Sequence, residues 1–140
     1  MPATPPPLLA SGNIYPCRFV TVSGAHAGAQ AGANARILGI ARNETNYPPI
    51  TDPRITVAGY HAVDGEPIRM LGDGEVGLVE AGAAITAGDR LKSDSNGKAV
   101  PIATTGNAVQ EIGAVAIAAA TTEGELILVQ CQPGATYIPN

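Results

Sequence analysis

The residue types that most often perform chemistry are sparse in this sequence. Two cysteines, Cys17 and Cys131, and two histidines, His26 and His61, could bind zinc or form a thiol–imidazole pair for nucleophilic catalysis. No two of the four residues stand at the short spacing of a zinc-ligand pair. Only Arg18 is basic near Cys17, which is not the electropositive setting that activates a thiol. We therefore predict two surface histidines, two buried thiols, no bound metal and no cofactor.

One alternative for the cysteines is a single disulfide that closes a long loop between Cys17 and Cys131. A secreted, disulfide-stapled domain usually carries more cysteines than two. The chain begins with neither the basic nor the apolar region of a signal peptide, and we expect it to be made in the cytoplasm. No apolar run reaches the roughly 20 residues that cross a bilayer, so no membrane contact is predicted.

A glycine pattern typical of dinucleotide sites occurs once, from Gly72 to Gly77. Such a site needs a helix to begin there, so that its N-terminus meets the pyrophosphate. Here a strand-like sequence follows, and Asp73 and Glu75 stand where a phosphate would lie. The other carboxylates are scattered beside glycines, and the chain has no Gly-x-Ser-x-Gly motif for a serine nucleophile. We predict that the protein is not an enzyme.

The composition indicates one compact domain that is mainly β. The chain has 140 residues, of which 45% are hydrophobic and 14% are charged, and it contains 17 glycines and 12 prolines. Frequent glycine and proline favour short strands joined by tight turns over long helices. The formal net charge is −4 and there is no run of lysine or arginine, so nucleic acid is not an expected partner.

Nine segments combine β-branched or aromatic residues with turn signals at their ends. We expect strands at residues 17–22, 37–41, 55–60, 67–71, 75–80, 90–93, 98–102, 112–118 and 125–131. Residues 25–35 read as a loop or a frayed helix, and residues 42–54 as a long loop. In the last strand Ile127, Val129 and Cys131 share one face, while Leu126, Leu128 and Gln130 share the other. Because both faces are largely apolar, this strand is expected at the centre of a sheet or at an interface.

The first 16 residues form a separate section. Pro5, Pro6 and Pro7 favour extended polyproline geometry, and Leu8 and Leu9 follow them. We predict an extended, proline-rich arm over residues 1–16 and one β-rich domain over residues 17–140. The arm is either a disordered tag or an anchor that docks on a partner.

A faint internal repeat runs through the chain. A strand with a central glycine, Gly39 or Gly113, is followed after a loop by a Gly-Glu pair and another strand. The Gly-Glu pairs lie at residues 65–66 and 124–125. We predict a structural repeat rather than a chance echo, with the longer insertion in the first copy.

The most distinctive stretch, residues 79–101, is a chain of tight turns between short strands. We expect positive φ at three glycines and turn-capping carboxylates at two aspartates, namely Gly82, Gly88, Gly97, Asp89 and Asp94. The stretch resembles the tailed-phage capsid decoration proteins, also called cement or head-stabilising proteins. They carry a similar Ile-x-x-Gly-Asp-x-Leu turn, here residues 85–91, and then a Ser-Asp-x-x-Gly hairpin. They tend to close with Ile-Gly-x-Ala and Gly-Glu-x-Ile-x-Val, here within residues 112–129.

The resemblance covers residues 65–134 and implies a fold, a function and partners. It implies a small β-barrel-like domain of β-tulip or β-clip type, often a homotrimer, with an N-terminal arm that reaches onto the capsid. The implied function is structural: binding the major capsid protein on the outer capsid surface of the virion, after synthesis in the host cytoplasm. The implied capsid-binding candidates are Pro5, Pro6, Pro7, Leu8 and Leu9. Residues 42–54 depart from the commonest pattern of the family.

A small-molecule-binding or carrier β-module is the alternative. Residues 85–91 also resemble a turn of sugar-acid-binding β-clip domains, and Lys98 follows an Asn-Gly turn as in a lipoyl carrier hairpin. A carrier hairpin places an acidic residue or Met beside its lysine, whereas Lys98 lies between Gly97 and Ala99. A lipoyl or biotinyl adduct on Lys98 would favour this alternative.

Overall fold

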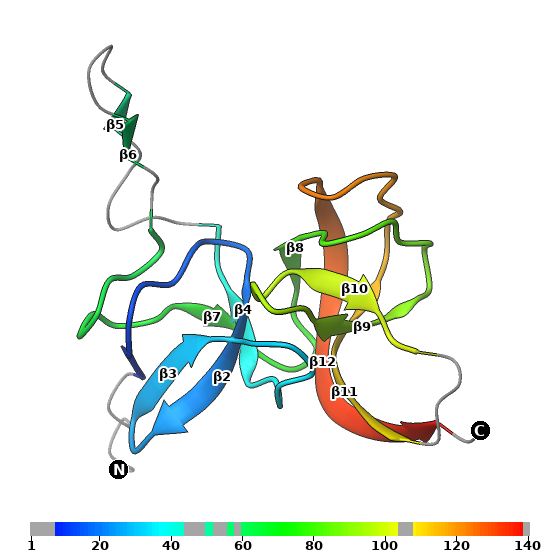
Figure 1. Cartoon of the computed structure of the whole chain (residues 1–140), viewed down its shortest axis with the longest axis horizontal. Helices are drawn as coiled ribbons and strands as arrows, with labels where there is room; N and C mark the ends of the chain where they lie inside the picture. The colour runs from blue at the N-terminus through cyan, green and yellow to red at the C-terminus, as the bar shows by residue number, and fades with distance from the viewer. Residues whose placement is uncertain (1–7, 44–49, 52–55, 58–59, 104–107, 139–140) are drawn as a thin grey trace.

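The structure is a computed structural model that describes residues 8–43, 50–51, 56–57, 60–103 and 108–138. Over these residues the fold contains strands and turns and no helix, so nothing in them forms a helix that could cross a membrane. Two five-stranded sheets lie side by side, and a small two-stranded pair stands apart from both (Figure 1). The predicted mainly-β fold is confirmed.

The first sheet has the strand order β1-β3-β2-β4-β7. These strands span Leu9–Ala10 (β1), Ala27–Gln30 (β3), Phe19–Gly24 (β2), Gly39–Ala41 (β4) and Met70–Leu71 (β7). β1 runs parallel to β3, and the other neighbours are antiparallel. The separate pair consists of β5, Ile50–Thr51, and β6, Thr56–Val57, within and just beyond the segment predicted as a long loop.

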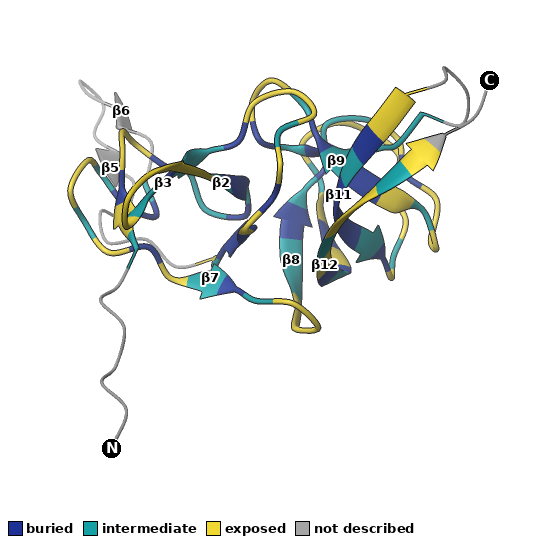
Figure 2. Ribbon diagram, turned by 90° about the horizontal axis from the view of Figure 1, so that it is seen from below, coloured by how far each residue is buried: buried dark blue, intermediate teal, exposed yellow. Residues whose placement is uncertain are grey.

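The second sheet has the order β10-β9-β11-β12-β8 and is antiparallel throughout. Its strands span Ala99–Pro101 (β10), Arg90–Ser93 (β9), Ala108–Ala116 (β11), Leu126–Ile138 (β12) and Val76–Glu80 (β8). The long strands β11 and β12 curl together beyond the rest of the sheet (Figure 1). Figure 2 shows that the buried residues lie mainly in the strands of both sheets, while the turns and parts of β2, β11 and β12 are exposed.

The two sheets are copies of one hydrogen-bonding pattern. We call residues 9–71 the first repeat and residues 80–130 the second repeat. β2 lies between β3 and β4 as β9 lies between β10 and β11, and β4 pairs with β7 as β11 pairs with β12. The registers agree: Ile40 lies opposite Leu71, and Val115 lies opposite Gln130. The predicted internal repeat is confirmed.

The connections between the strands repeat as well. Ile14 and Ala62 form an isolated antiparallel bridge, and Ile85 and Ala120 form its counterpart. Three residues after each isoleucine the backbone is left-handed, with φ of 60° at Cys17 and 95° at Gly88. The register places Ala114, and not Gly113, at the position of Gly39, so the predicted alignment was wrong by one residue.

The Gly-Glu pairs close equivalent loops. Gly65 and Gly124 have φ of 87° and 96°, which a residue without a side chain adopts freely. The carboxylate of Glu66 accepts a hydrogen bond from the Val63 amide at 2.9 Å, and that of Glu125 accepts one from the Thr121 amide at 3.0 Å. The segment that precedes this pair is long in the first repeat (residues 42–61, which include β5 and β6) and short in the second (residues 117–119), as predicted.

Each repeat has the same interior. One buried cluster lies within the first repeat: Ala10, Ile14, Val20, Ala41, Ala62 and Ile68. Its counterparts by register all belong to the second, larger cluster: Ala81, Ile85, Leu91, Ala116, Ala120 and Ile127. Each set of six consists of three alanines and three larger aliphatic residues, at matching positions.

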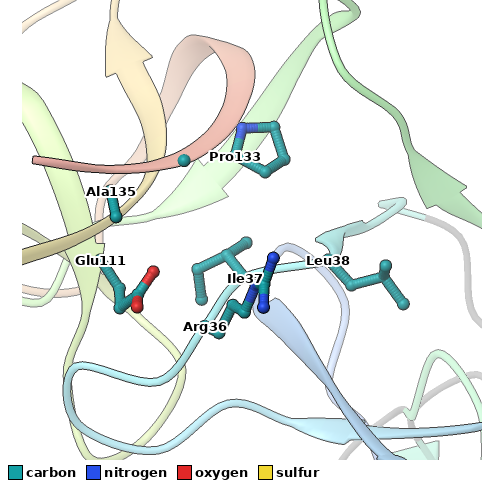
Figure 3. A pocket seen from close by; sticks show the side chains of 7 residues that line it. Arg36, Ile37, Leu38, Glu111, Pro133 and Ala135 are labelled. Atoms are coloured by element: carbon teal, nitrogen blue, oxygen red, sulfur yellow. The ribbon is translucent and has the colours of Figure 1, made fainter.

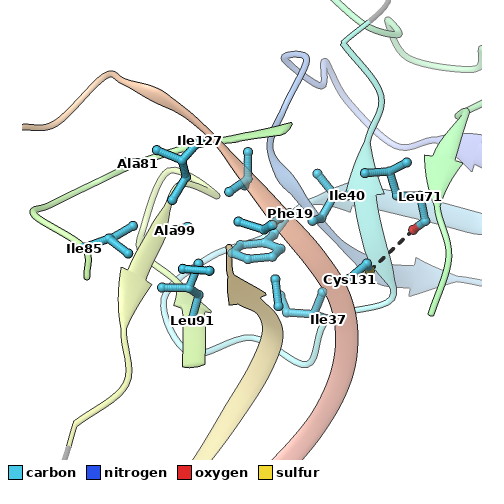
Figure 4. Packing of buried hydrophobic residues seen from close by; sticks show 14 of the residues in the cluster. Phe19, Ile37, Ile40, Leu71, Ala81, Ile85, Leu91, Ala99, Ile127 and Cys131 are labelled. Atoms are coloured by element: carbon cyan, nitrogen blue, oxygen red, sulfur yellow. Dashed lines mark hydrogen bonds between the residues drawn. The ribbon is translucent and has the colours of Figure 1, made fainter. Parts of the chain in front are cut away.

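The repeats join through the outer face of the first sheet (Figure 4). Phe19, Ile40 and Leu71 are buried in the larger cluster with residues of the second repeat. A Cβ on Gly113 would lie 2.5 Å from the Phe19 ring, so only glycine allows this approach. The thiol of Cys131 donates to the Leu71 carbonyl at 3.6 Å in the same contact.

Residues 25–35 were predicted as a loop or a frayed helix, and this is wrong, because Ala27–Gln30 forms β3. β3 pairs with β1 and β2, and the alanine-rich sequence is held extended by these partners. Gly28 fits beneath neighbouring side chains, since an added Cβ would lie 2.8 Å from Leu8.

The predicted boundary of the arm at residue 16 also differs from the structure. Leu9–Ala10 is a strand of the first sheet, and Ile14 is fully buried. Residues 8–16 are therefore part of the folded body, because their apolar side chains complete the first repeat's interior. Of the predicted arm, residues 1–7 lie outside the described residues.

Candidate interaction surfaces

The two cysteines show no sign of a reactive or metal-binding role in the described part of the chain. Among the described residues no three His, Cys, Asp or Glu side chains gather as metal ligands. Both cysteines are free and buried, which confirms the buried thiols and excludes the disulfide. Burial, and then the charge of Glu80, raises the pKa of Cys17 to about 11. Burial, and then the charges of Asp73 and Glu75, raises the pKa of Cys131 to about 11, so both thiols are neutral and unreactive at pH 7.

The two histidines have different surroundings. His26 is exposed, as predicted. His61 was predicted at the surface, and this is wrong, because its side chain is fully buried. Its Nε2 accepts a hydrogen bond from the Arg69 backbone amide at 2.9 Å, beside β7. In the second repeat the position equivalent to Arg69 is Leu128, and this residue pairs with β8 instead. The histidine thus supplies an acceptor at a sheet edge, a role that single-residue patterns do not reveal.

The turn chemistry of residues 79–101 is largely as predicted. Gly88 and Gly97 have positive φ, whereas the prediction for Gly82 is wrong. Gly82 is needed for space, since an added Cβ would meet an oxygen of the Asp94 carboxylate and Lys98 Cβ. The Asp94 carboxylate accepts hydrogen bonds from the Asn96 and Lys98 amides at 2.8 and 2.9 Å and fixes the hairpin.

Lys98 belongs to a network of ion pairs that joins the repeats. Its ammonium lies 3.0 Å from Glu123 and 3.1 Å from Glu80, and Glu80 also pairs with Arg18 of the first repeat at 3.3 Å. The hydrogen bonds to Glu123 and then Glu80 raise the pKa of Lys98. A carrier lysine must reach out to accept its prosthetic group, whereas this side chain is 16% exposed and held by two carboxylates.

One cleft of about 480 Å³ opens between the repeats, at the base of the curled β11–β12 pair (Figure 3). It is lined by Arg36, Ile37, Leu38, Glu111, Pro133, Gly134 and Ala135. Sites for small molecules are usually lined by aromatic and apolar side chains with a few convergent polar groups. This lining has no aromatic residue, histidine or cysteine, and its charged side chains are one arginine and one glutamate.

An apolar surface covers the outer face of the second sheet, on β8, β12 and the end of β11. β12 has Ile127, Val129 and Cys131 buried on its inner side, as its alternation predicted. On its outer side Leu126 and Leu128 are 47% and 40% exposed. The register aligns them with outward residues of the neighbouring strands. We call this surface the outer patch; it consists of Val76, Leu78, Val115, Ile117, Leu126 and Leu128.

The candidate residues from the sequence fall in three places. Pro5, Pro6 and Pro7 lie outside the described residues. Leu8 is half-buried and packs against the interior of the first repeat. Leu9 is 40% exposed at the start of β1. The sequence signals the outer patch through the second apolar face of the last strand. Because of its two apolar faces, this strand is expected from the sequence at the centre of a sheet or at an interface.

A family model described as phage cement protein matches residues 9–131 of the chain. The chain belongs to the phage cement protein family. The match spans both repeats and the outer patch, and it begins after Pro5, Pro6, Pro7 and Leu8. Phage cement proteins are structural, non-enzymatic components of the virion that lie on the capsid surface and stabilise it. The predicted family, structural function and location are thereby confirmed.

A solved structure shares the fold of this cement protein. The head fiber gp8.5 N base of bacteriophage phi29 matches with a TM-score of 0.51 and 22% sequence identity, over 89% of each chain. At this identity the likeness concerns the fold alone. No curated protein matches the sequence.

Proposed function

We propose that this cement protein grips the major capsid protein through its proline-rich N-terminal segment, Pro5 to Leu9, and acts as a homo-oligomer, with a trimer favoured. The family supplies capsid binding. The observation that carries the segment's role is the junction at Leu8 and Leu9. Leu8 packs into the first repeat's interior, while the next side chain is 40% exposed. The body, of β-tulip or β-clip type, thus holds the base of the segment firmly.

The physical logic favours a stiff segment at such a junction. Three successive prolines restrict φ in the free chain, so less conformational entropy is lost when the segment is ordered on a partner. The negative net charge and the lack of basic runs suit the exterior of a particle, away from the genome. A homo-oligomer would present several segments at once, which raises avidity on a repeating lattice.

Deleting residues 2–7 tests the role of the segment. The cut leaves Leu8 and the whole first repeat intact. Co-sedimentation with expanded, undecorated heads of the source virus should show saturable binding of the full chain at a fixed ratio to the capsid subunit. The deletion should lower this binding at least tenfold while the unfolding transition stays unchanged.

A length-matched control replaces Pro5, Pro6 and Pro7 with Gly-Ser-Gly. If stiffness matters, this variant should bind more weakly than the full chain and more strongly than the deletion. Undiminished binding by the deletion variant would overturn the segment's role and leave capsid binding by the folded body in place. No binding by the full chain to competent heads would overturn capsid binding for the tested source.

A further inference from the structure

Residues of the outer patch can be compared with the residues at the equivalent positions of the first repeat. In the first repeat the Arg42 amide donates to the Arg69 carbonyl at 2.9 Å. At the same place in the second repeat the Ile117 amide donates to the Leu128 carbonyl at 2.9 Å. Two arginines of one repeat thus correspond to two aliphatic residues of the other. The fold therefore does not require apolar side chains at these positions, and a different cause must account for them.

One further position of the outer patch also differs between the repeats. Leu126 lies opposite Glu80 in the second repeat, and its counterpart Pro67 bridges to Leu9 in the first. Val76, Ile117, Leu126 and Leu128 are between 40% and 51% exposed on one face of one sheet. Isolated exposed aliphatic residues are ordinary on protein surfaces, but a group of them on one face of one sheet marks an interaction surface.

The chemistry of the outer patch favours a permanent partner. Its six members are aliphatic, the uncharged side chain of Gln130 lies between Val76 and Val115, and charged groups such as Glu80 and Arg90 lie at its border. Depletion of charge at the centre is typical of homo-oligomer interfaces, whereas surfaces that bind after the partners have folded separately are more polar. The repeating lattice of a capsid offers the second kind of contact.

The first repeat offers a precedent for the kind of protein that covers this face. In the first repeat the same face of the sheet presents Phe19, Ile40 and Leu71, and these are buried against the second repeat of the same chain. We propose that the outer patch of the second sheet binds a second copy of this chain. This assignment deepens the homo-oligomer of the proposed function, on which it rests, by locating its interface.

The contact between copies differs from the contact between repeats. The latter depends on Gly113, which leaves room for the Phe19 ring. The first repeat has Leu38 at the position of Gly113, and Leu38 is 37% exposed. The outer patch of one chain therefore cannot stack on the first repeat of the next as the repeats stack within a chain. This favours a closed oligomer over an open filament.

The test replaces Ile117 and Leu128 with arginine, the residue that the first repeat carries at both positions. Size-exclusion chromatography with light scattering should give the wild type a mass that is a multiple of 14.1 kDa, and the double variant a mass of 14.1 kDa. The matched controls are Val22→Arg and Val109→Arg, which are 58% and 52% exposed outside the outer patch and should keep the wild-type mass. If the double variant does not fold, Leu128→Gln tests the same surface without adding charge.

The outcomes separate this interface from capsid binding. A monomeric wild type at tens of micromolar, or folded patch variants that keep the wild-type mass, would overturn the proposal. Patch variants that keep the oligomer and lose head binding would also overturn it and would assign the outer patch to the capsid. A monomeric double variant that still binds heads, with at least tenfold weaker apparent affinity, supports it. A wild-type protein that is oligomeric but does not bind competent heads would overturn only the capsid-binding function.

Discussion

The two repeats share a scaffold and differ in what lies on it. The order and registers of their four shared strands coincide, as do their interiors, and the left-handed residue after the first bridge occurs in both, at Cys17 and Gly88. They diverge on their outer faces. The first repeat buries Phe19, Ile40 and Leu71 against the second, while the second exposes aliphatic side chains to solvent. The comparison separates what the fold requires, namely the interior and turn residues, from what the interfaces require.

Two glycines beside the second repeat leave room for large side chains of the first repeat. Gly113 and Gly77 lie where side chains of the first repeat arrive, and a Cβ on either would lie within 2.5 Å of Phe19 or Leu71. The positions are on the second repeat's side of the contact, so the glycines act as sockets for large side chains. An asymmetric pair of repeats follows, in which one face is used inside the chain and its counterpart is left for other partners.

The largest effect is expected when Gly113 is replaced with leucine, the residue that the first repeat has at the equivalent position, Leu38. Gly113→Leu should destabilise the protein by about 3 kcal/mol or more, because overpacking forces the repeats apart at Phe19. Urea unfolding followed by circular dichroism measures the change. Gly134→Ala is the matched control, since nothing lies within 4 Å of its added Cβ, and it should change stability by less than about 0.5 kcal/mol. Equal effects of the two substitutions would contradict the socket.

His61 tests how the first repeat completes its sheet edge where the second repeat has β8. His61→Ala should cost about 2–3 kcal/mol, because it leaves a cavity and leaves the Arg69 amide without its imidazole acceptor. His61→Gln keeps a side chain that can accept the bond, and it should recover part of the loss. His26→Ala, at an exposed position, should be neutral. Equal changes in the free energy of unfolding for His61→Ala and His26→Ala would contradict a stabilising role of His61 at the sheet edge.

The sequence predicted best those features that depend on neighbouring residues. Arg90–Ser93 forms a strand as expected, and the turns at Gly88, Gly97 and Asp94 have the predicted chemistry. These features follow from local conformational preference, which single residues carry. The Gly-Glu pairs revealed the repeat because the same local loop closure is needed twice.

Features that depend on distant partners were missed. β3 forms in an alanine- and glycine-rich stretch because β1 and β2 flank it, and nothing within the stretch itself marks a strand. Residues 8–16 belong to the body because Ile14 fits an interior whose other members come from several strands. The outer patch was visible only as a strand with two apolar faces, since its exposure depends on what the other repeat covers.

The last prediction concerns the two buried thiols and uses the dependence of stability on pH to compare the repeats. The pKa of both Cys17 and Cys131 is raised to about 11 in the folded protein, chiefly by burial, from an ordinary value near 9. A raised folded-state pKa means that the stabilisation is fully present below pH 9 and is lost as the pH rises towards 11. Unfolding midpoints in urea should therefore fall between pH 9 and pH 11.

Substituting each thiol separates the contributions of the two cysteines to the loss of stability between pH 9 and pH 11. Cys131→Ala removes the thiol at the contact between repeats, and Cys17→Gly gives the first repeat the residue that the second has at its left-handed position. Each should flatten part of the alkaline decline, and the double variant should flatten more than either. An alkaline decline that is unchanged in the double variant would assign it to other groups. A thiol reagent at pH 8 should leave both cysteines unmodified in the native protein and label both after unfolding, because only the open chain exposes a thiolate.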